Sequence, residues 1–196
     1  MECLSESAMN IQNSRSEWGL FSIVVHWLVA IVVFGLFGLG LYMVELDYYD
    51  SMYKTAPFVH KSIGALLFFV VIFRVLWRFI SPPPDALETH KKWERTLAHW
   101  VHIALYCIVL ILMVSGYLIS TADGRPVSVF GWFEIPSIIS GIDNQEDIAG
   151  EIHEILAYVL ISMVAIHAAG ALKHHFLDRD RTILRMLGIS KANEKS

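Results

Sequence analysis

Long apolar stretches separated by shorter polar ones form the dominant pattern of the chain. Residues 18–44 and 96–122 contain no Asp, Glu, Lys or Arg, and neither do residues 155–172. Because about 20 helical residues cross the hydrocarbon core of a bilayer, these runs predict three membrane-spanning helices. Their predicted limits are about residues 19–43, 96–121 and 151–176.

A fourth span, at about residues 56–80, is less uniformly apolar because it contains Lys61 and Arg74. We expect both side chains near the ends of the span, where a long aliphatic stem lets the charged group reach the membrane surface. The span ends before the prolines at 82–84, which cannot continue a helix. Together the spans predict an all-α, integral membrane, up-down four-helix bundle. The predicted membrane domain is residues 18–186, between a flexible N-terminal tail of residues 1–17 and a C-terminal tail of residues 187–196.

The composition agrees with a membrane protein. Hydrophobic residues make up 55% of the chain and charged residues 17%, whereas a soluble domain is about one quarter charged. The first eighteen residues carry charges and no apolar core, so we expect no signal peptide. Cys3 and Cys107 are too few for a thiolate metal site, and the lack of a C-x-x-C-H motif excludes covalently attached c-type haem. We expect membrane lipid around the chain and no nucleic-acid partner.

Basic residues are concentrated on one side of the predicted bundle. That side carries Arg15, the basic residues at or between the second and third spans, and those at the C-terminal end, which are twelve of the fifteen Lys and Arg residues. The opposite side has only Lys54, Lys61 and Arg125, amid ten acidic residues. Since basic loops stay in the cytoplasm, we expect both termini to be cytoplasmic.

The loop between the third and fourth spans, residues 122–150, is long for a helical bundle. Its middle, PVSVFGWFEIP, is apolar, so we expect it to fold over the outer end of the bundle or to lie in the membrane interface. The acidic stretch DNQED that follows is expected to form a solvated turn or a docking patch for a basic partner.

Four histidines in or beside the spans are the strongest candidates for chemistry. Neutral imidazole is polar, so burying it in hydrocarbon costs free energy unless its nitrogens are bound. His153 and His167 are fourteen residues apart, which places them on nearly the same helix face and about 21 Å apart in depth. His60 lies at the depth of His153, and His26 at the depth of His167. Two imidazoles facing each other at one depth suit the axial positions of a haem iron, so the sequence predicts two haems stacked in the bundle core.

Other interpretations of these histidines stay open. Each one alone is compatible with a hydrogen-bonded packing residue or a proton relay. A shared zinc ion needs three or four ligands at one point, and the two pairs lie too far apart in depth. The residue four positions after each candidate ligand is small and leaves room for a porphyrin: Ala30, Gly64, Ala157 and Ala171. His99 and His102 are alternative ligands for the inner haem, although large residues, Ile103 and Tyr106, follow them one turn later.

A second group of polar side chains gathers near the inner haem position. It comprises Arg74, Arg78, His174 and His175. Quinone reduction needs a proton donor and hydrogen bonds to two carbonyl groups, so these side chains are candidate contacts for a quinone or for haem propionates. Alternatively, they are interfacial charges that meet anionic lipid headgroups.

Several stretches of the chain resemble the bacterial cytochrome b561 family. They are SIVVHWL, APFVHKSIG, FRVLWRFISPPP, SGYLISTADGRPVSVFGWFEIP and HEILAYVLISMVAIHAAGALKHHF, within about residues 18–185. The resemblance implies a di-haem cytochrome b of the bacterial inner membrane, with His26 paired with His167 and His60 paired with His153 as axial ligands of two b haems. It also implies respiratory electron transfer between a periplasmic-side donor, either a small molecule or a protein, and a quinone such as ubiquinone.

One branch of the family resembles superoxide oxidase, in which superoxide reduces the outer haem and ubiquinone is reduced at the inner one. Superoxide is an anion, so a side with three basic and ten acidic residues disfavours it and better suits a neutral or cationic donor. The alternative prediction is a haem-bearing anchor subunit of a membrane dehydrogenase or hydrogenase, which the four-helix pattern also resembles. The sequence leaves open the donor, whether the chain is itself an enzyme, and whether it forms a homodimer.

Overall fold

The computed structural model describes residues 10–189 and consists mostly of helix. The long helices are α1 (Leu20–Val44), α2 (Thr55–Ile80), α3 (Lys92–Thr121) and α4 (Gln145–Phe176). All four are long and apolar enough to cross a membrane, which confirms the prediction of four membrane-spanning helices. The remaining elements are a hairpin of β1 (Val127–Val129) and β2 (Phe133–Ile135) and a short helix, α5 (Thr182–Met186).

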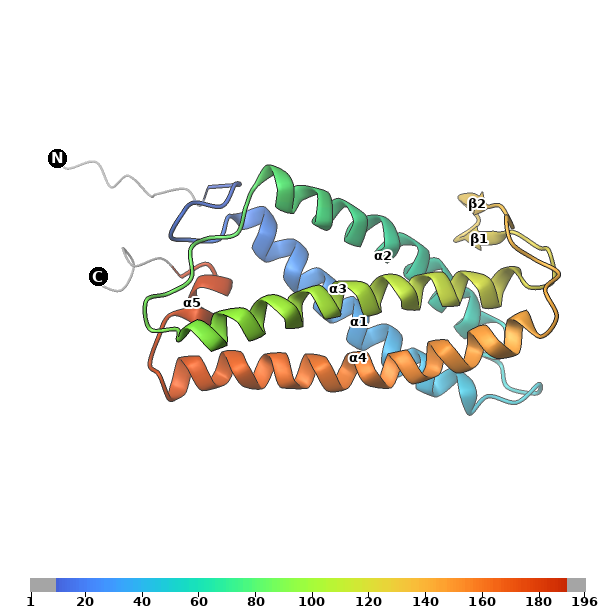
Figure 1. Ribbon diagram of the computed structural model, residues 1–196. Coiled ribbons are helices and arrows are strands. Elements are labelled where there is room, and N and C mark those ends of the chain that lie inside the picture. The colour runs from blue at the N-terminus through green and yellow to red at the C-terminus, as the bar shows by residue number, and fades with distance from the viewer. Residues whose placement is uncertain (1–9, 190–196) are drawn as a thin grey trace.

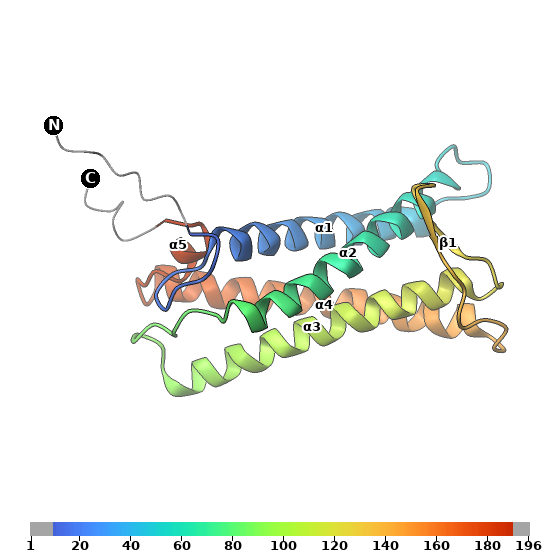
Figure 2. The same ribbon diagram turned by 90° about the horizontal axis from the view of Figure 1, so that it is seen from above.

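The long helices lie side by side, with α5 at one end of the bundle and the hairpin at the other (Figures 1 and 2). We call these the terminal end and the hairpin end. Helix α1 packs closely on α2, and α3 packs closely on α4, whereas close backbone contacts between α4 and either α1 or α2 are few. The bundle is therefore built from two helix pairs, and side chains of α1 and α2 meet those of α4 across the space between the pairs.

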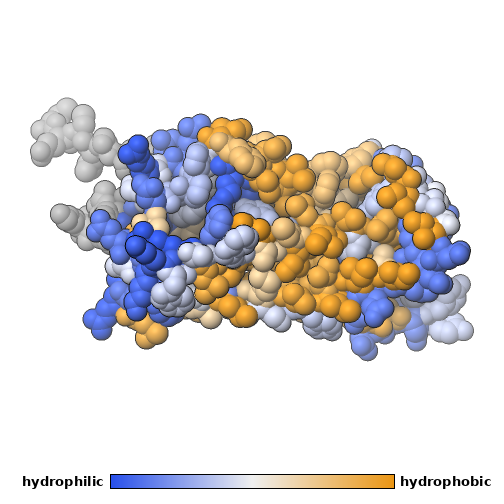
Figure 3. Space-filling model, viewed as in Figure 1, coloured by the Kyte–Doolittle hydropathy of each residue, from blue (hydrophilic) through white to orange (hydrophobic). Residues whose placement is uncertain are grey.

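Most apolar side chains of the long helices lie on the surface rather than in a core. Figure 3 shows them as a hydrophobic band along the middle of the bundle, between more hydrophilic ends. Exposed examples from the four helices are Val24, Phe34, Phe69, Val114 and Ile166. In water so large an apolar surface is unfavourable, but in a bilayer it is the surface that spanning helices present to lipid.

Helices α3 and α4 begin at Lys92 and Gln145, before the spans predicted from hydropathy. Polar first turns extend both helices beyond their apolar parts. In α3, the side chain of Glu94 accepts a hydrogen bond from the backbone N–H of Lys91 (2.8 Å). In α4, the first turn carries two acidic residues, which interact favourably with the positive end of the helix dipole. Hydropathy therefore marks only the part of each helix that suits hydrocarbon.

Residues 10–19 are held against the terminal end of the bundle. The backbone N–H of Asn13 donates to Oγ of Ser81 (2.9 Å), and its side-chain amide donates to the Ser81 carbonyl oxygen (2.8 Å). Arg181 donates a hydrogen bond to Glu17 (3.0 Å). These contacts join the second half of the predicted N-terminal tail to the end of α2 and the start of α5. The rest of the predicted tails, residues 1–9 with Cys3 and residues 190–196, lie outside the described residues.

The apolar middle of the long loop forms the antiparallel hairpin, with Val127 paired with Ile135. Strand β1 packs against α2, and Val129 is fully buried there. Oγ of Ser62 on α2 accepts a hydrogen bond from the backbone N–H of Phe130 (3.1 Å). The loop therefore folds onto the hairpin end of the bundle and fixes the position of α2 beside it.

Candidate functional site

Two pairs of histidines face each other across the space between α4 and the α1–α2 pair. His60 on α2 and His153 on α4 form the outer pair, toward the hairpin end, and their ring centres are 6.2 Å apart. His26 on α1 and His167 on α4 form the inner pair, toward the terminal end, with ring centres 6.5 Å apart. The structure thus brings together the same residues that the depth argument pairs.

The spacing of both pairs suits one metal ion between two imidazoles. A first-row metal lies about 2 Å from a ligating imidazole nitrogen, and that nitrogen lies about 1.2 Å from the centre of its ring. When one metal lies midway between two imidazoles on a common axis, the two ring centres are therefore about 6.4 Å apart. The observed separations of 6.2 and 6.5 Å lie on either side of this value. Direct packing or hydrogen bonding of two imidazoles does not require such a gap, so the distances fit axial ligation of a haem iron.

The hydrogen bonds of His153 prepare its ring for a metal. Nδ1 lies 3.0 Å from the carbonyl oxygen of Leu112 and 3.0 Å from Oγ of Ser115. A carbonyl oxygen can only accept, so Nδ1 carries the proton and Nε2 keeps its lone pair. This is how proteins commonly orient a metal-ligating histidine. On the opposite ring, Nδ1 of His60 is buried and has no hydrogen-bond partner among the described residues.

A cavity of about 1300 Å³ surrounds the outer pair. Its lining is mainly apolar and contains the small residues Gly40, Gly64, Gly116 and Ala157. A Cβ atom on Gly116 would lie 3.1 Å from Cε1 of His153, and one on Gly40 would lie 3.6 Å from Cε1 of His60. Glycine at these two positions leaves room for the imidazole rings. Neither glycine lies one turn after a candidate ligand in the sequence, so the spacing of small residues along the chain does not reveal them.

Charged side chains also line this cavity at the hairpin end. They are Lys54, Lys61, Asp123, Arg125, Glu146 and Glu154. Arg125 forms an ion pair with Asp123, and its Nε donates a hydrogen bond to Asp123 (2.6 Å). This hydrogen bond lowers the pKa of Asp123 below its usual value of 3.8. The carboxylate therefore stays ionised and offsets the charge of Arg125 at any physiological pH.

The inner pair has additional polar neighbours. The ring of His102 on α3 lies 5.1 Å from that of His167, a separation shorter than a metal between the rings requires. His26 at 6.5 Å is therefore the better-spaced partner of His167. Arg74 on α2 donates a hydrogen bond to Nδ1 of His26 (2.9 Å) and lies over the ring of Tyr106, with its guanidinium carbon 5.6 Å from the ring centre.

The other candidate residues lie in four different surroundings. Arg78 lies within electrostatic range of Arg74 and His102 and so belongs to the surroundings of the inner pair. His175 has a buried Nδ1 without a hydrogen-bond partner among the described residues. Nδ1 of His174 lies 2.7 Å from Asp178, in a cluster at the surface of the terminal end. His99 is exposed beside Trp100.

The sequence matches the family described as prokaryotic cytochrome b561 over residues 17–188. It is 48% identical to cytochrome b561 homolog 2 of Escherichia coli (strain K12) over 185 residues, which cover 94% of this chain and 98% of that protein. It is 25% identical to cytochrome b561 homolog 1 of the same strain, over 70% of this chain and 78% of that protein. It is also 25% identical to the probable superoxide oxidase CybB of Yersinia pestis, over 88% of this chain and 97% of that protein.

Proposed function

The chain belongs to the prokaryotic cytochrome b561 family, a family of haem b membrane cytochromes, and on that premise we propose that it carries two b haems and transfers electrons between a periplasmic-side donor and a membrane quinone. The proposed acceptor is ubiquinone, and the proposed location is the bacterial inner membrane. The proposed orientation has the terminal end in the cytoplasm, because twelve of the fifteen Lys and Arg residues belong to that side of the sequence.

The two opposed histidine pairs are the observation that carries this proposal. The ring centres of the two pairs are 6.2 and 6.5 Å apart, which suits one metal ion between two imidazoles in each pair. The two candidate ligands on α4 are separated by about 21 Å along the helix, most of the roughly 30 Å hydrocarbon core. When bound, each haem supplies an iron that gains and loses one electron. With two haems, an electron would cross the membrane in several short transfers instead of one long one.

The residues of the chain contribute orientation and space around the outer pair. Leu112 and Ser115 hold the proton of His153 on Nδ1, so that Nε2 keeps its lone pair for a metal. Gly116 and Gly40 allow the backbones of α3 and α1 to approach the rings. The lining of the cavity is largely apolar, and both ligation strength and reduction potential respond to the polarity of such surroundings.

Among the candidate residues near the inner pair, Arg74 has the strongest support as a contact for a haem propionate or a quinone. It lies within hydrogen-bond distance of His26, and a guanidinium suits carboxylate oxygens because it presents several donors in one plane. Arg78 adds a second positive charge nearby. The buried Nδ1 of His175 is a further candidate for a quinone carbonyl. His174 is less well supported in this role, since Asp178 lies 2.7 Å from its Nδ1.

Superoxide is a second candidate donor, because the chain is 25% identical to the probable superoxide oxidase CybB of Yersinia pestis. Lys54, Lys61 and Arg125 line the cavity around the outer pair, where they would attract an anion, and Asp123, Glu146 and Glu154 on the same lining offset that attraction. Stopped-flow mixing of the oxidised protein with superoxide tests this donor. Haem reduction no faster than in a b-type cytochrome without such a cavity would count against it.

The pyridine haemochrome assay on purified protein tests the main proposal. We expect two b haems per chain, and a ratio of one or zero would contradict the two-pair arrangement. Adding a quinol to the isolated chain then separates the proposal from the dehydrogenase-anchor alternative. A self-contained quinone oxidoreductase exchanges electrons with quinol by itself, whereas an anchor needs the catalytic subunit of its partner enzyme.

A further inference from the structure

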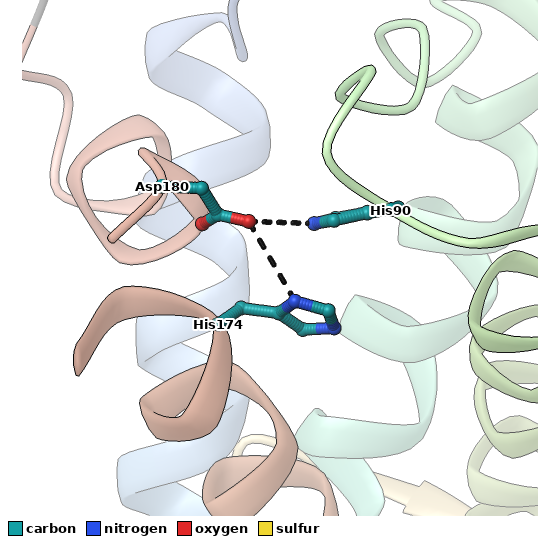
Figure 4. A group of neighbouring side chains, drawn as sticks. All are labelled: His90, His174 and Asp180. Carbon is teal, nitrogen blue, oxygen red and sulfur yellow. Dashed lines mark hydrogen bonds and ion pairs between the residues drawn. The ribbon is translucent and has the colours of Figure 1, made fainter. Parts of the chain in front are cut away.

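We propose that His90, His174 and Asp180 bind one divalent transition-metal cation, such as Zn²⁺, at the terminal end of the bundle. The three side chains come from three separate segments: the loop between α2 and α3, the last turn of α4 and the turn before α5 (Figure 4). This site is distinct from both histidine pairs, and its occupancy does not depend on haem.

The distances among the candidate ligand atoms suit a tetrahedral metal. Nε2 of His90 lies 2.9 Å from Oδ2 of Asp180, and Nδ1 of His174 lies 3.6 Å from the same oxygen. The ligands of a tetrahedral zinc ion with bonds of about 2.0 Å are about 3.3 Å apart. All three ligand atoms lie within 4.8 Å of one another, so small side-chain rotations bring them to one ion.

The carboxylate at the centre of the cluster is already held in place. Oδ1 of Asp180 accepts a hydrogen bond from the backbone N–H of Thr182 (2.8 Å), which directs Oδ2 toward the two histidines. The side chain of Asp180 is only 3% exposed, and those of His90 and His174 are 18% and 15% exposed. Water therefore competes weakly at the carboxylate, while the partly exposed imidazoles leave a path for an ion to enter.

Simple hydrogen bonding does not account for the whole cluster. The contact between His90 and Asp180 is a hydrogen bond and alone would join the loop to the turn. His174 is different, because its Nδ1 lies near two carboxylates at once, 2.7 Å from Oδ2 of Asp178 and 3.6 Å from Oδ2 of Asp180. The imidazole rings of His90 and His174 also lie against each other, with centres 4.2 Å apart and planes tilted by 38°. Two imidazoles and one carboxylate form a ligand set that zinc and its neighbours prefer over Ca²⁺ or Mg²⁺.

A neighbouring group, Glu94, His174 and Asp178, carries less weight as a metal site. The ammonium group of Lys173 already lies 2.7 Å from Glu94 and 2.6 Å from Asp178. A metal there would have to displace this cation. The Lys173 ammonium does not pair with Asp180, and the guanidinium of Arg185 lies within electrostatic range of that carboxylate, so a metal at Asp180 would not have to displace Lys173.

Zinc titration of the full-length, haem-loaded protein tests the site. The protein carries no polyhistidine tag, is stripped with a chelator, and is titrated with Zn²⁺ in detergent against a chromogenic zinc indicator. We expect one site per chain, with affinity reduced at least about 10-fold in His90→Gln and in Asp180→Asn. The exposed histidine variant His99→Gln is the matched control and should bind zinc like the wild type.

The haem spectrum of each variant reports folding independently of zinc, and His90→Gln leaves the bond between Asp180 and Thr182 intact. X-ray absorption at the zinc edge of the wild-type protein supplies a second measurement, with two imidazole ligands expected. Wild-type affinity in both His90→Gln and Asp180→Asn would overturn the proposal. So would the absence of a stoichiometric site, or a zinc spectrum without imidazole.

Discussion

Arg74 donates a hydrogen bond from Nη2 to Nδ1 of His26, which joins α2 to α1 beside the inner pair (2.9 Å). A guanidinium has no acceptor atom, so the proton of the neutral ring sits on Nε2 in this arrangement. Ligation of a metal through Nε2 requires the other tautomer, with the proton on Nδ1. His26 would therefore ligate iron through Nε2 only if Arg74 no longer donated to its Nδ1. The guanidinium of Arg74 would then be free to donate to another acceptor, such as a haem propionate or a quinone carbonyl.

Removing the charge of Arg74 should change the inner haem and not the outer one. In Arg74→Gln, loss of a nearby positive charge favours the oxidised iron, so we expect the potential of one haem to fall by about 30–60 mV, where about 59 mV is a tenfold change for one electron. Optical redox titration measures this shift. Arg125→Gln, at the opposite end, is the control and should leave that haem unchanged. Equal shifts in both variants would argue against a local role for Arg74.

Alanine substitution of the paired histidines should remove haem in pairs. His60→Ala and His153→Ala should each lose the outer haem and keep the inner one, so the ratio of haem to chain falls from about two to about one. Pyridine haemochrome assays and low-temperature spectra of the α band measure the loss. His99→Ala should retain both haems. Loss of different haems in His60→Ala and His153→Ala would show that these two residues do not share an iron.

The glycine beside His153 should be intolerant of a side chain. A Cβ atom at Gly116 would lie 3.1 Å from Cε1 of His153, so Gly116→Ala must push the ring aside and Gly116→Val must do so further. We expect lower occupancy of the outer haem in Gly116→Ala, with a greater loss in Gly116→Val. A Cβ on Gly38 would meet nothing within 4 Å, which makes Gly38→Ala the matched control. Alanine favours helix over glycine by about 1 kcal/mol, so a loss at Gly116 cannot come from helix propensity.

Neutralising Asp123 should speed the reaction with anionic donors. Its carboxylate offsets Arg125 beside the outer cavity, so Asp123→Asn leaves the guanidinium uncompensated and should raise the rate of haem reduction by superoxide about two- to fivefold at low salt. Stopped-flow measurements at 20 and 500 mM salt check this, because screening should abolish most of the gain. Asp143→Asn, an exposed change outside the cavity lining, should have little effect.

The pH dependence of this effect follows from the lowered pKa of Asp123. A carboxyl group with a lowered pKa keeps its charge above its usual value of 3.8 and loses it only as the pH falls through the lower value. The ratio of the Asp123→Asn rate to the wild-type rate should therefore stay constant between pH 6 and pH 8, where superoxide is an anion. A ratio that falls toward one as the pH drops from 8 to 6 would show that Asp123 titrates in this range and that the ion pair does not set its charge.

The sequence by itself determined the spans and the depth of the histidines. Hydrocarbon offers no hydrogen bonds, so the length of each apolar run fixes where a helix crosses it, and runs such as residues 18–44 give a direct signal. The helical rise per residue is also fixed, so the fourteen residues between His153 and His167 translate into depth. Both arguments use distances along one helix, which do not depend on neighbouring chain segments.

Only the tertiary structure decided which side chains face one another around those depths. Depth alone leaves His102 and His26 as rival partners of His167, and the ring separations distinguish them because they depend on how each helix is rotated about its own axis. The same rotation brings Gly116 and Ser115 of α3 against His153. The cluster of His90, His174 and Asp180 joins segments up to ninety residues apart in the chain, and no spacing in the sequence encodes the path of the loops that bring them together.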